Sequence, residues 1–242
     1  MEALEIQTRV VDAVDMLSVD VSDALRVDGT ISRMDFRLHG RTVGQDDSAT
    51  RLAALRVLGA DALTPFVLAD RSFDQSDAEA FRQAVLRYPA PATERVGPVD
   101  AWRMRDWALG QVLGDLGTPL AELPTDLEPQ VDSTGDSEPW TTWSAGLLAV
   151  SSLALPGLDS APRRQTAKRR LDLSRGMSRS IMRRDYFGAA RLARWIALDV
   201  AAGGPPDEFV EPALAHIAVL AGHQPRTRLE VTLAQILLRR NG

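Results

Sequence analysis

Apolar residues recur at three- and four-residue steps along most of this 242-residue chain, and this spacing constrains its fold more than any other feature. It places apolar side chains along one face of an α-helix, whereas a strand would need strict alternation. Residues 1–26 show the pattern clearly, with aspartates on the other faces. Because no strand pattern alternates with helical ones, the spacing predicts an all-α protein.

Glycine, proline and capping residues separate the periodic segments. Asp185, for example, stands at the start of one apolar segment, and residues 203–206 end it. The expected helices cover residues 1–26, 49–58, 74–88, 98–113, 140–155, 162–184, 186–201, 207–221 and 227–240. We therefore expect an irregular multi-helix bundle of about nine or ten helices, with the C-terminal third built as stacked helical hairpins.

Three parts are expected along the chain. Residues 1–118 form an acidic helical part, residues 119–139 an acidic flexible loop or linker, and residues 140–242 a basic helical part that packs with the first into one globule. Residues 140–155 are apolar on nearly every side, which is typical of a central core helix. Residues 31–38 alternate in polarity, so a short strand, a short helix and an extended loop all stay open.

One short stretch is similar to a known repeat. Residues 185–193, DYFGAARLA, are similar to the aromatic–alanine pattern of tetratricopeptide helices. The similarity covers one or two units at most, and the flanking Trp-Leu-Gly-Tyr pattern is absent. It implies the packing of helical hairpins and does not assign a family.

Charge is divided unevenly along this chain, whose formal net charge is −5. Residues 1–162 hold 13 basic and 26 acidic side chains, whereas residues 163–242 hold 15 basic and 7 acidic ones. Residues 163–184 alone carry nine Lys or Arg side chains against one acid, Asp172. Such a segment indicates either an internal partner of opposite charge or a surface for an anionic partner.

The basic residues of this segment recur at helical steps, so one helix face would carry a basic stripe, with a break or kink near Gly176. The candidate residues for binding an anion or a partner are Arg164, Lys168, Arg175, Arg179, Arg183 and Arg184. Arg170, Arg191 and Arg194 would extend the positive charge. Three interpretations stay open: pairing with the acidic N-terminal part, binding of an acidic protein or nucleic acid, and convergence on the carboxylate, sulfate or phosphate of a small substrate.

The sequence carries no catalytic motif. It has no cysteine, which excludes thiolate nucleophiles and Cys-ligated metals, and no phosphate-binding glycine loop. Its three histidines lack the spacing of metal ligands, so we expect no metal and no cofactor. His216 is the candidate catalytic residue as a proton carrier, although a structural core histidine fits the same pattern.

Trp140 and Trp143 are one helical turn apart and directly follow the acidic segment. Two such indoles are typical of ordinary core anchors. They would also suit an aromatic wall at the mouth of a pocket, and the sequence leaves both interpretations open.

Taken together, these patterns favour a helical interaction, regulatory or accessory protein that engages an anionic partner through the arginine-rich helix. The alternative is a cofactor-independent enzyme of specialised metabolism that holds a small anionic substrate with arginines. An acidic protein, a small anionic ligand or further copies of the chain are the expected partners. The negative net charge and a pI near 5.3 argue against nucleic acid.

Nothing in the sequence predicts a membrane segment. Residues 145–158 are too short an apolar run to span a bilayer. The acidic N-terminal residues also lack the basic and apolar regions of a signal peptide. We therefore expect a cytoplasmic protein.

Overall fold

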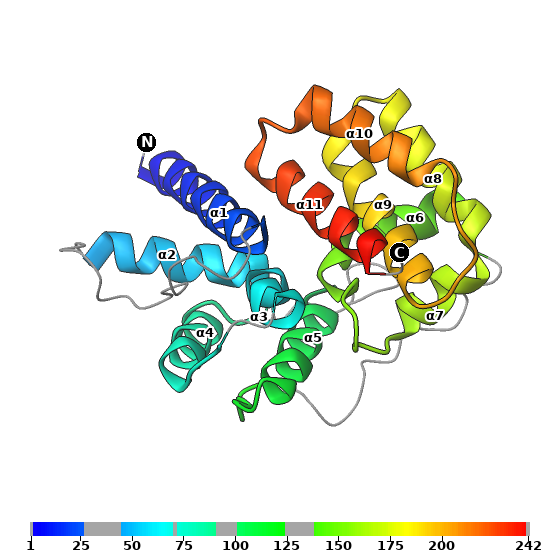
Figure 1. Ribbon diagram of the computed structural model, residues 1–242. Coiled ribbons are helices and arrows are strands. Elements are labelled where there is room, and N and C mark those ends of the chain that lie inside the picture. The colour runs from blue at the N-terminus through cyan, green and yellow to red at the C-terminus, as the bar shows by residue number, and fades with distance from the viewer. Residues whose placement is uncertain (1, 27–44, 70–71, 91–100, 124–137, 241–242) are drawn as a thin grey trace. The chain divides into compact units, whose positions relative to one another are not determined.

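The computed structural model describes residues 2–26, 45–69, 72–90, 101–123 and 138–240 (Figure 1). These residues form α-helices with short 3-10 segments and contain no strand, which confirms the all-α prediction. Residues 31–38, Pro98 and most of the predicted acidic loop lie outside the described residues.

The chain divides into two compact units. Unit 1 comprises Met1–Ala92 with Arg105–Leu127, and unit 2 comprises Thr93–Met104 with Glu128–Gly242. The predicted division into residues 1–118, 119–139 and 140–242, packed as one globule, stays a prediction.

Unit 1 is built from helices around a small apolar core. In chain order its helices are α1 (Glu2–Arg26), α2 (Gln45–Leu58), α3 (Thr64–Leu68), α4 (Gln75–Arg87) and the part of α5 (Ala101–Asp115) from Arg105. α1 packs on α2 and α3, and α4 packs on α2. Val14, Leu17 and Val21 of α1 are buried at three- and four-residue steps, as the periodicity predicts.

Two polar interactions fix the helices of unit 1. Asp74 caps α4, because its carboxylate accepts hydrogen bonds from the backbone N–H groups of Ser76 and Asp77 at 2.9 and 3.1 Å. Arg56 of α2 forms a buried ion pair with Asp106 of α5, in which the longer of two hydrogen bonds is 3.0 Å. The sequence offers Asp74 or Ser76 as the cap, and the structure shows Asp74 in that role. The ion pair joins residues that are fifty positions apart, which no local pattern predicts.

Unit 2 contains the stacked helical hairpins that the sequence predicts (Figure 1). Its helices are α6 (Trp140–Ala149), α7 (Ala161–Lys168), α8 (Arg170–Met182), α9 (Tyr186–Ala201), α10 (Val210–Ala221) and α11 (Pro225–Arg239). α8 packs on α9, α9 on α10, and α10 on α11. α9 also contacts α6, α7 and α11, so it is the helix around which the others are arranged.

The prediction that residues 140–155 form a central core helix is wrong. α6 ends at Ala149, and a 3-10 turn, Ser151–Leu153, follows it. Only Trp143, Ser144 and Leu147 of α6 are buried, and several of its other side chains line the pocket described below. The central helix is α9, which buries most of its side chains, including Trp195 at 0% exposure.

A buried polar network joins α9 to α11 and to the end of α6. Arg194 of α9 is fully buried, and its Nη1 lies 3.1 Å from Oε2 of Glu230 on α11. The other oxygen of Glu230 accepts hydrogen bonds from Arg191 Nε and Ser151 Oγ, both at 3.3 Å. Arg191 also donates to the Leu148 carbonyl oxygen at 3.0 Å. Arg191 and Arg194 thus act inside unit 2, and the expectation that they extend a surface charge is wrong.

We predict that Glu230→Gln destabilises unit 2. The substitution keeps the shape of the side chain but leaves the buried Arg194 guanidinium without its counter-charge, and breaking such a pair typically costs about 3–5 kcal/mol. Urea unfolding followed by tryptophan fluorescence measures the loss.

Glu5→Gln on the exposed face of α1 is the matched control, with an expected change within about 0.5 kcal/mol. Equal stability of the two variants would contradict a structural role for the buried pair.

Candidate functional site

The basic segment folds as two helices, α7 and α8, and not as one. Ser160 caps α7, since its hydroxyl oxygen accepts a hydrogen bond from the backbone N–H of Arg163 at 3.3 Å. Pro162 stands in the first turn, where proline is tolerated. The break falls at Arg169, which has φ −113° and ψ 35°. The predicted break at Gly176 is wrong, because α8 runs without interruption through that residue.

Four arginines of α7, α8 and the junction between them are held by carboxylates within unit 2. The pairs are Arg164–Asp159 (2.9 Å), Arg169–Asp172 (2.9 Å), Arg175–Asp172 (3.3 Å) and Arg170–Asp199 (3.1 Å). None of these ion pairs reaches a carboxylate of unit 1. The pairing described here is therefore local.

Arg179 and Arg183, near the C-terminal end of α8, differ from these neighbours. Neither forms an ion pair within the described residues, and both side chains are exposed. The Arg179 guanidinium lies 5.7 Å from the centre of the Trp140 ring, a cation–π contact that orients the charge without neutralising it. Positive charge is therefore retained at this end of the helix.

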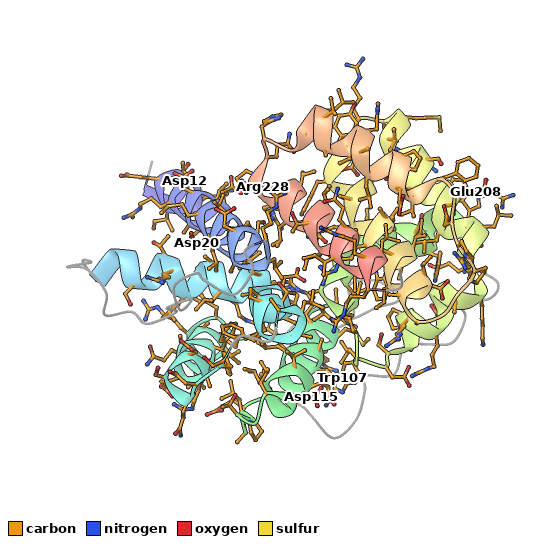
Figure 2. The ribbon with its side chains drawn as sticks, in the orientation of Figure 1. Asp12, Asp20, Trp107, Asp115, Glu208 and Arg228 are labelled. Atoms are coloured by element: carbon orange, nitrogen blue, oxygen red, sulfur yellow. The ribbon has the colours of Figure 1, made fainter. Side chains whose placement is uncertain are left out.

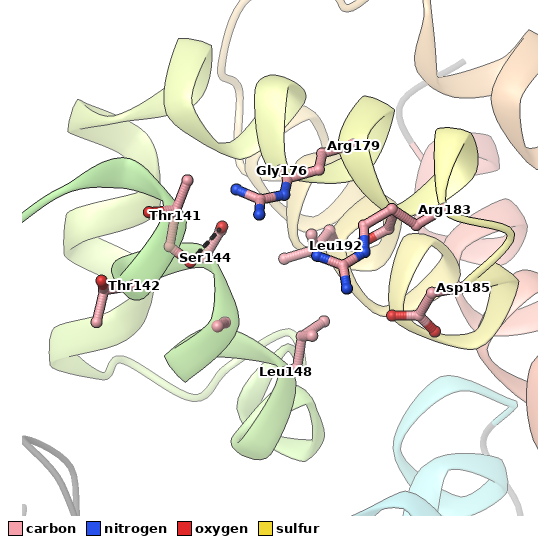
Figure 3. A pocket seen from close by; sticks show the side chains of 11 residues that line it. Thr141, Thr142, Ser144, Leu148, Gly176, Arg179, Arg183, Asp185 and Leu192 are labelled. Atoms are coloured by element: carbon pink, nitrogen blue, oxygen red, sulfur yellow. Dashed lines mark hydrogen bonds between the residues drawn. The ribbon is translucent and has the colours of Figure 1, made fainter.

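Both arginines line a pocket of about 260 Å³ between α6 and α8 (Figure 3). Figure 3 shows the two guanidinium groups pointing from α8 toward α6. Arg179 and Arg183 are four positions apart, so they project from the same face of α8. The pocket lies wholly within unit 2.

Hydroxyl groups, short apolar side chains, Gly176 and the carboxylate of Asp185 complete the lining. The hydroxyls belong to Thr141, Thr142 and Ser144 of α6 and to Ser180 of α8. Ala145 and Leu148 of α6 and Leu192 of α9 supply apolar contact. Two guanidinium groups with several hydroxyls suit the oxygens of a carboxylate, sulfate or phosphate, and the apolar side suits a carbon chain attached to it.

Sequence reasoning missed these hydroxyls. Ser180 directly follows Arg179 in the sequence, so its hydroxyl could have been predicted to lie near the candidate arginines. Thr141 and Thr142 carry no such signal, because hydroxyl and apolar side chains are mixed along residues 140–149 and the pattern does not tell which face meets α8.

Gly176 allows α6 and α8 to approach closely beside the pocket. A Cβ atom at this position would lie 2.7 Å from Ser144 Cβ and 3.2 Å from Leu192 Cδ1. Because the Cβ of Ser144 is attached to the α6 backbone, no side-chain rotation relieves the first contact. The distance between the two helices, and with it the width of the pocket, therefore depends on this glycine.

Arg184 ends α8 in a backbone conformation that favours glycine. Its φ is 59°, and it is the one non-glycine residue with positive φ in the described part of the chain. The Arg184 N–H donates to the Ile181 carbonyl and the Asp185 N–H to the Ser180 carbonyl, both at 2.9 Å, which is the Schellman pattern. Asp185 then caps α9 by accepting from the Gly188 N–H at 2.9 Å, as the sequence predicts. The turn thus fixes Ser180 and Asp185, both of which line the pocket.

The remaining predicted residues lie around the pocket or away from it. Trp143 is buried, donates to Gln165 Oε1 at 3.1 Å and carries the Arg169 guanidinium 4.5 Å from its ring centre. Lys168 is exposed on α7. His216 is exposed on α10, where its ring meets Tyr186 edge to face at 6.3 Å, and it is not among the residues that line the pocket.

Unit 1 contains a carboxylate with a raised pKa, that of Asp20. Asp20 of α1 is exposed, but neighbouring protein atoms partly desolvate its carboxylate, and this desolvation raises its pKa. The Arg51 cation opposes the shift, and the charge of Asp23 adds to it. Within the described ranges, no group of three or more His, Asp or Glu side chains is placed to hold a metal ion.

None of the helices described has the length and apolar character that crossing a bilayer requires.

Comparison of the chain with protein-family models, with curated proteins and with solved structures found no match. The functional argument therefore rests on the geometry of the pocket.

We predict that Gly176→Ala is less stable than Gly146→Ala by about 1–3 kcal/mol, the usual cost of overpacking. Both substitutions improve helix propensity equally, but a Cβ at Gly146 meets nothing within 4 Å. Urea unfolding of the two variants isolates the steric term. Adding Ser144→Gly to Gly176→Ala removes the clashing atom and should restore stability, whereas adding Ser144→Ala should not.

We also predict that Arg184→Gly stabilises the protein by about 1 kcal/mol relative to Arg184→Ala. Both variants lose the same charge, and only glycine adopts positive φ without steric cost. Thermal unfolding compares them. Equal melting temperatures would show that the positive φ at this turn carries no strain.

Proposed function

We propose that this chain is a helical interaction, regulatory or accessory protein of the cytoplasm that engages an acidic protein partner through α7 and α8. Arg179 and Arg183 are the anchors of this surface. The basic residues that surround them are Arg164, Lys168, Arg175 and Arg184.

The observation that carries the proposal is that Arg179 and Arg183 combine a lack of ion pairs with a place in the pocket lining. Lys168 and Arg184 also form no ion pair among the described residues, but they do not line the pocket. Arg164, Arg169, Arg170 and Arg175 have carboxylate partners, whereas Arg179 and Arg183 form no ion pair among the described residues. A guanidinium presents a rigid fork of N–H donors that matches a carboxylate in bidentate geometry. Two such forks on one rigid helix face, exposed and beside hydroxyl donors, are arranged to receive an anion.

A small anionic substrate is the alternative, and the concave shape of the site favours it. Catalysis would require a group that moves a proton within reach of that substrate. His216, the predicted proton carrier, is not part of the pocket lining, and Asp185 already uses one oxygen to cap α9. Binding therefore has more support than catalysis.

We predict that Arg179→Ala/Arg183→Ala abolishes capture of an acidic partner. Wild-type and variant proteins are immobilised side by side and exposed to the same lysate of the source cells, and the retained proteins are quantified by mass spectrometry. Each charged hydrogen-bonding partner contributes about 1.5–3 kcal/mol, so loss of both arginines should weaken binding about 100-fold or more.

Arg239→Ala/Arg240→Ala at the end of α11 is the matched control, because it removes the same charge from another exposed position. An acidic protein retained equally by all three baits would contradict the proposal. If native mass spectrometry instead shows a small-molecule adduct on the wild-type protein alone, the small-ligand alternative is supported.

A further inference from the structure

Helix α10 carries apolar side chains on the face that it turns away from unit 2. Its inward face buries Val210, Leu214, Ile217 and Ala221. The exposed positions of the outward face include Pro212, Ala215, His216, Ala218, Val219 and Leu220. Val219 is 83% exposed and Leu220 43%. A surface helix normally carries charged or polar side chains on such a face, so α10 has the composition of a helix that is covered on both sides.

The charged and ionisable groups near this face are separated along the helix. Glu208 precedes α10 (Figure 2). Glu211 lies in the first turn of the helix, and both carboxylates are exposed. His216 lies past the middle, and His223 follows the helix end. Carboxylates thus stand at the N-terminal end and imidazoles at the middle and the C-terminal end, so a reversed second copy would set hydrogen-bond acceptors toward imidazole N–H donors.

We propose that two copies of this chain associate through antiparallel contact of their α10 helices. The inference is independent of the proposed function, since it uses neither the pocket nor its arginines. A two-fold axis makes the contact isologous, so each copy presents the same surface and the assembly closes as a dimer. Antiparallel alignment also sets the helix dipoles in opposite directions, which is favourable.

The arrangement of side chains selects one register. With the axis between Ala215 and His216, Pro212 lies opposite Val219 of the second copy. In the same register Glu208 lies opposite His223 of the second copy. The small side chain of Ala215 lies at the axis, where it allows the helices to approach closely. The register therefore covers the apolar side chains and sets the carboxylates at the N-terminal end of each helix toward the imidazoles at the C-terminal end of the other.

The absence of cysteine from the sequence makes a direct test possible. Ala215→Cys places one thiol per copy beside the axis, within the Cα separation that a disulfide accepts. Mild oxidation should convert this variant to a covalent dimer, seen by non-reducing electrophoresis. Ala167→Cys on the exposed face of α7 is the control and should stay monomeric under the same treatment.

Sedimentation of the unmodified protein gives the second readout. We expect a concentration-dependent dimer, and Val219→Glu should raise its dissociation constant at least about 100-fold, because it places two unpaired carboxylates in the apolar contact. Leu86→Glu on α4, another exposed apolar position at 53% exposure, should leave the dimer unchanged.

A monomer at every concentration overturns the proposal, as does a dimer that resists Val219→Glu. Efficient crosslinking of Ala167→Cys but not of Ala215→Cys overturns it as well, because the contact would then lie elsewhere. Since Val219 is exposed within the chain, circular dichroism should show that its substitution leaves the fold intact.

Discussion

The arrangement of unit 2 depends on one buried charge. Arg194 sits at the centre of α9 with no exposed surface, so its guanidinium requires a carboxylate, and Glu230 of α11 supplies it. Arg194 also donates to the Ala154 carbonyl oxygen at 3.0 Å, and Arg191 to that of Leu148. These bonds satisfy carbonyl groups at and beyond the end of α6, which would otherwise lack partners. The same arginines therefore hold α11 and α6 on α9, and the position of α6 defines one wall of the pocket.

Local features of the fold follow from the sequence because they depend on neighbouring residues. The three- and four-residue spacing in α1 predicts which side chains are buried, and Asp74 and Asp185 mark helix starts because their carboxylates reach only the next turn. The hairpin order of α8 to α11 follows from short connections at Gly203 and Gly222. Each of these inferences needs only information from within about ten residues.

Features that depend on distant residues escaped sequence reasoning. An arginine stripe does not reveal which carboxylates reach it, and Asp199, twenty-nine positions away, proves to hold Arg170. The apolar composition of α6 suggested the core, but its small side chains leave it partly exposed while α9 takes the centre. The candidate site was predictable only in part: spacing put Arg179 and Arg183 on one face, whereas the facing hydroxyls come from a different helix.

Gly176 has a consequence for how the pocket responds to an occupant. Ser144 of α6 occupies the space that a side chain at position 176 of α8 would need. Because Ser144 also lines the pocket, the contact that joins α6 to α8 is part of the pocket wall. Any widening of the pocket would separate packed atoms, and any narrowing would bring Ser144 onto the α8 backbone. The spacing of the two helix backbones is therefore set before anything enters the pocket, whereas the exposed Arg179 and Arg183 side chains would still lose rotamer freedom if they held a guest.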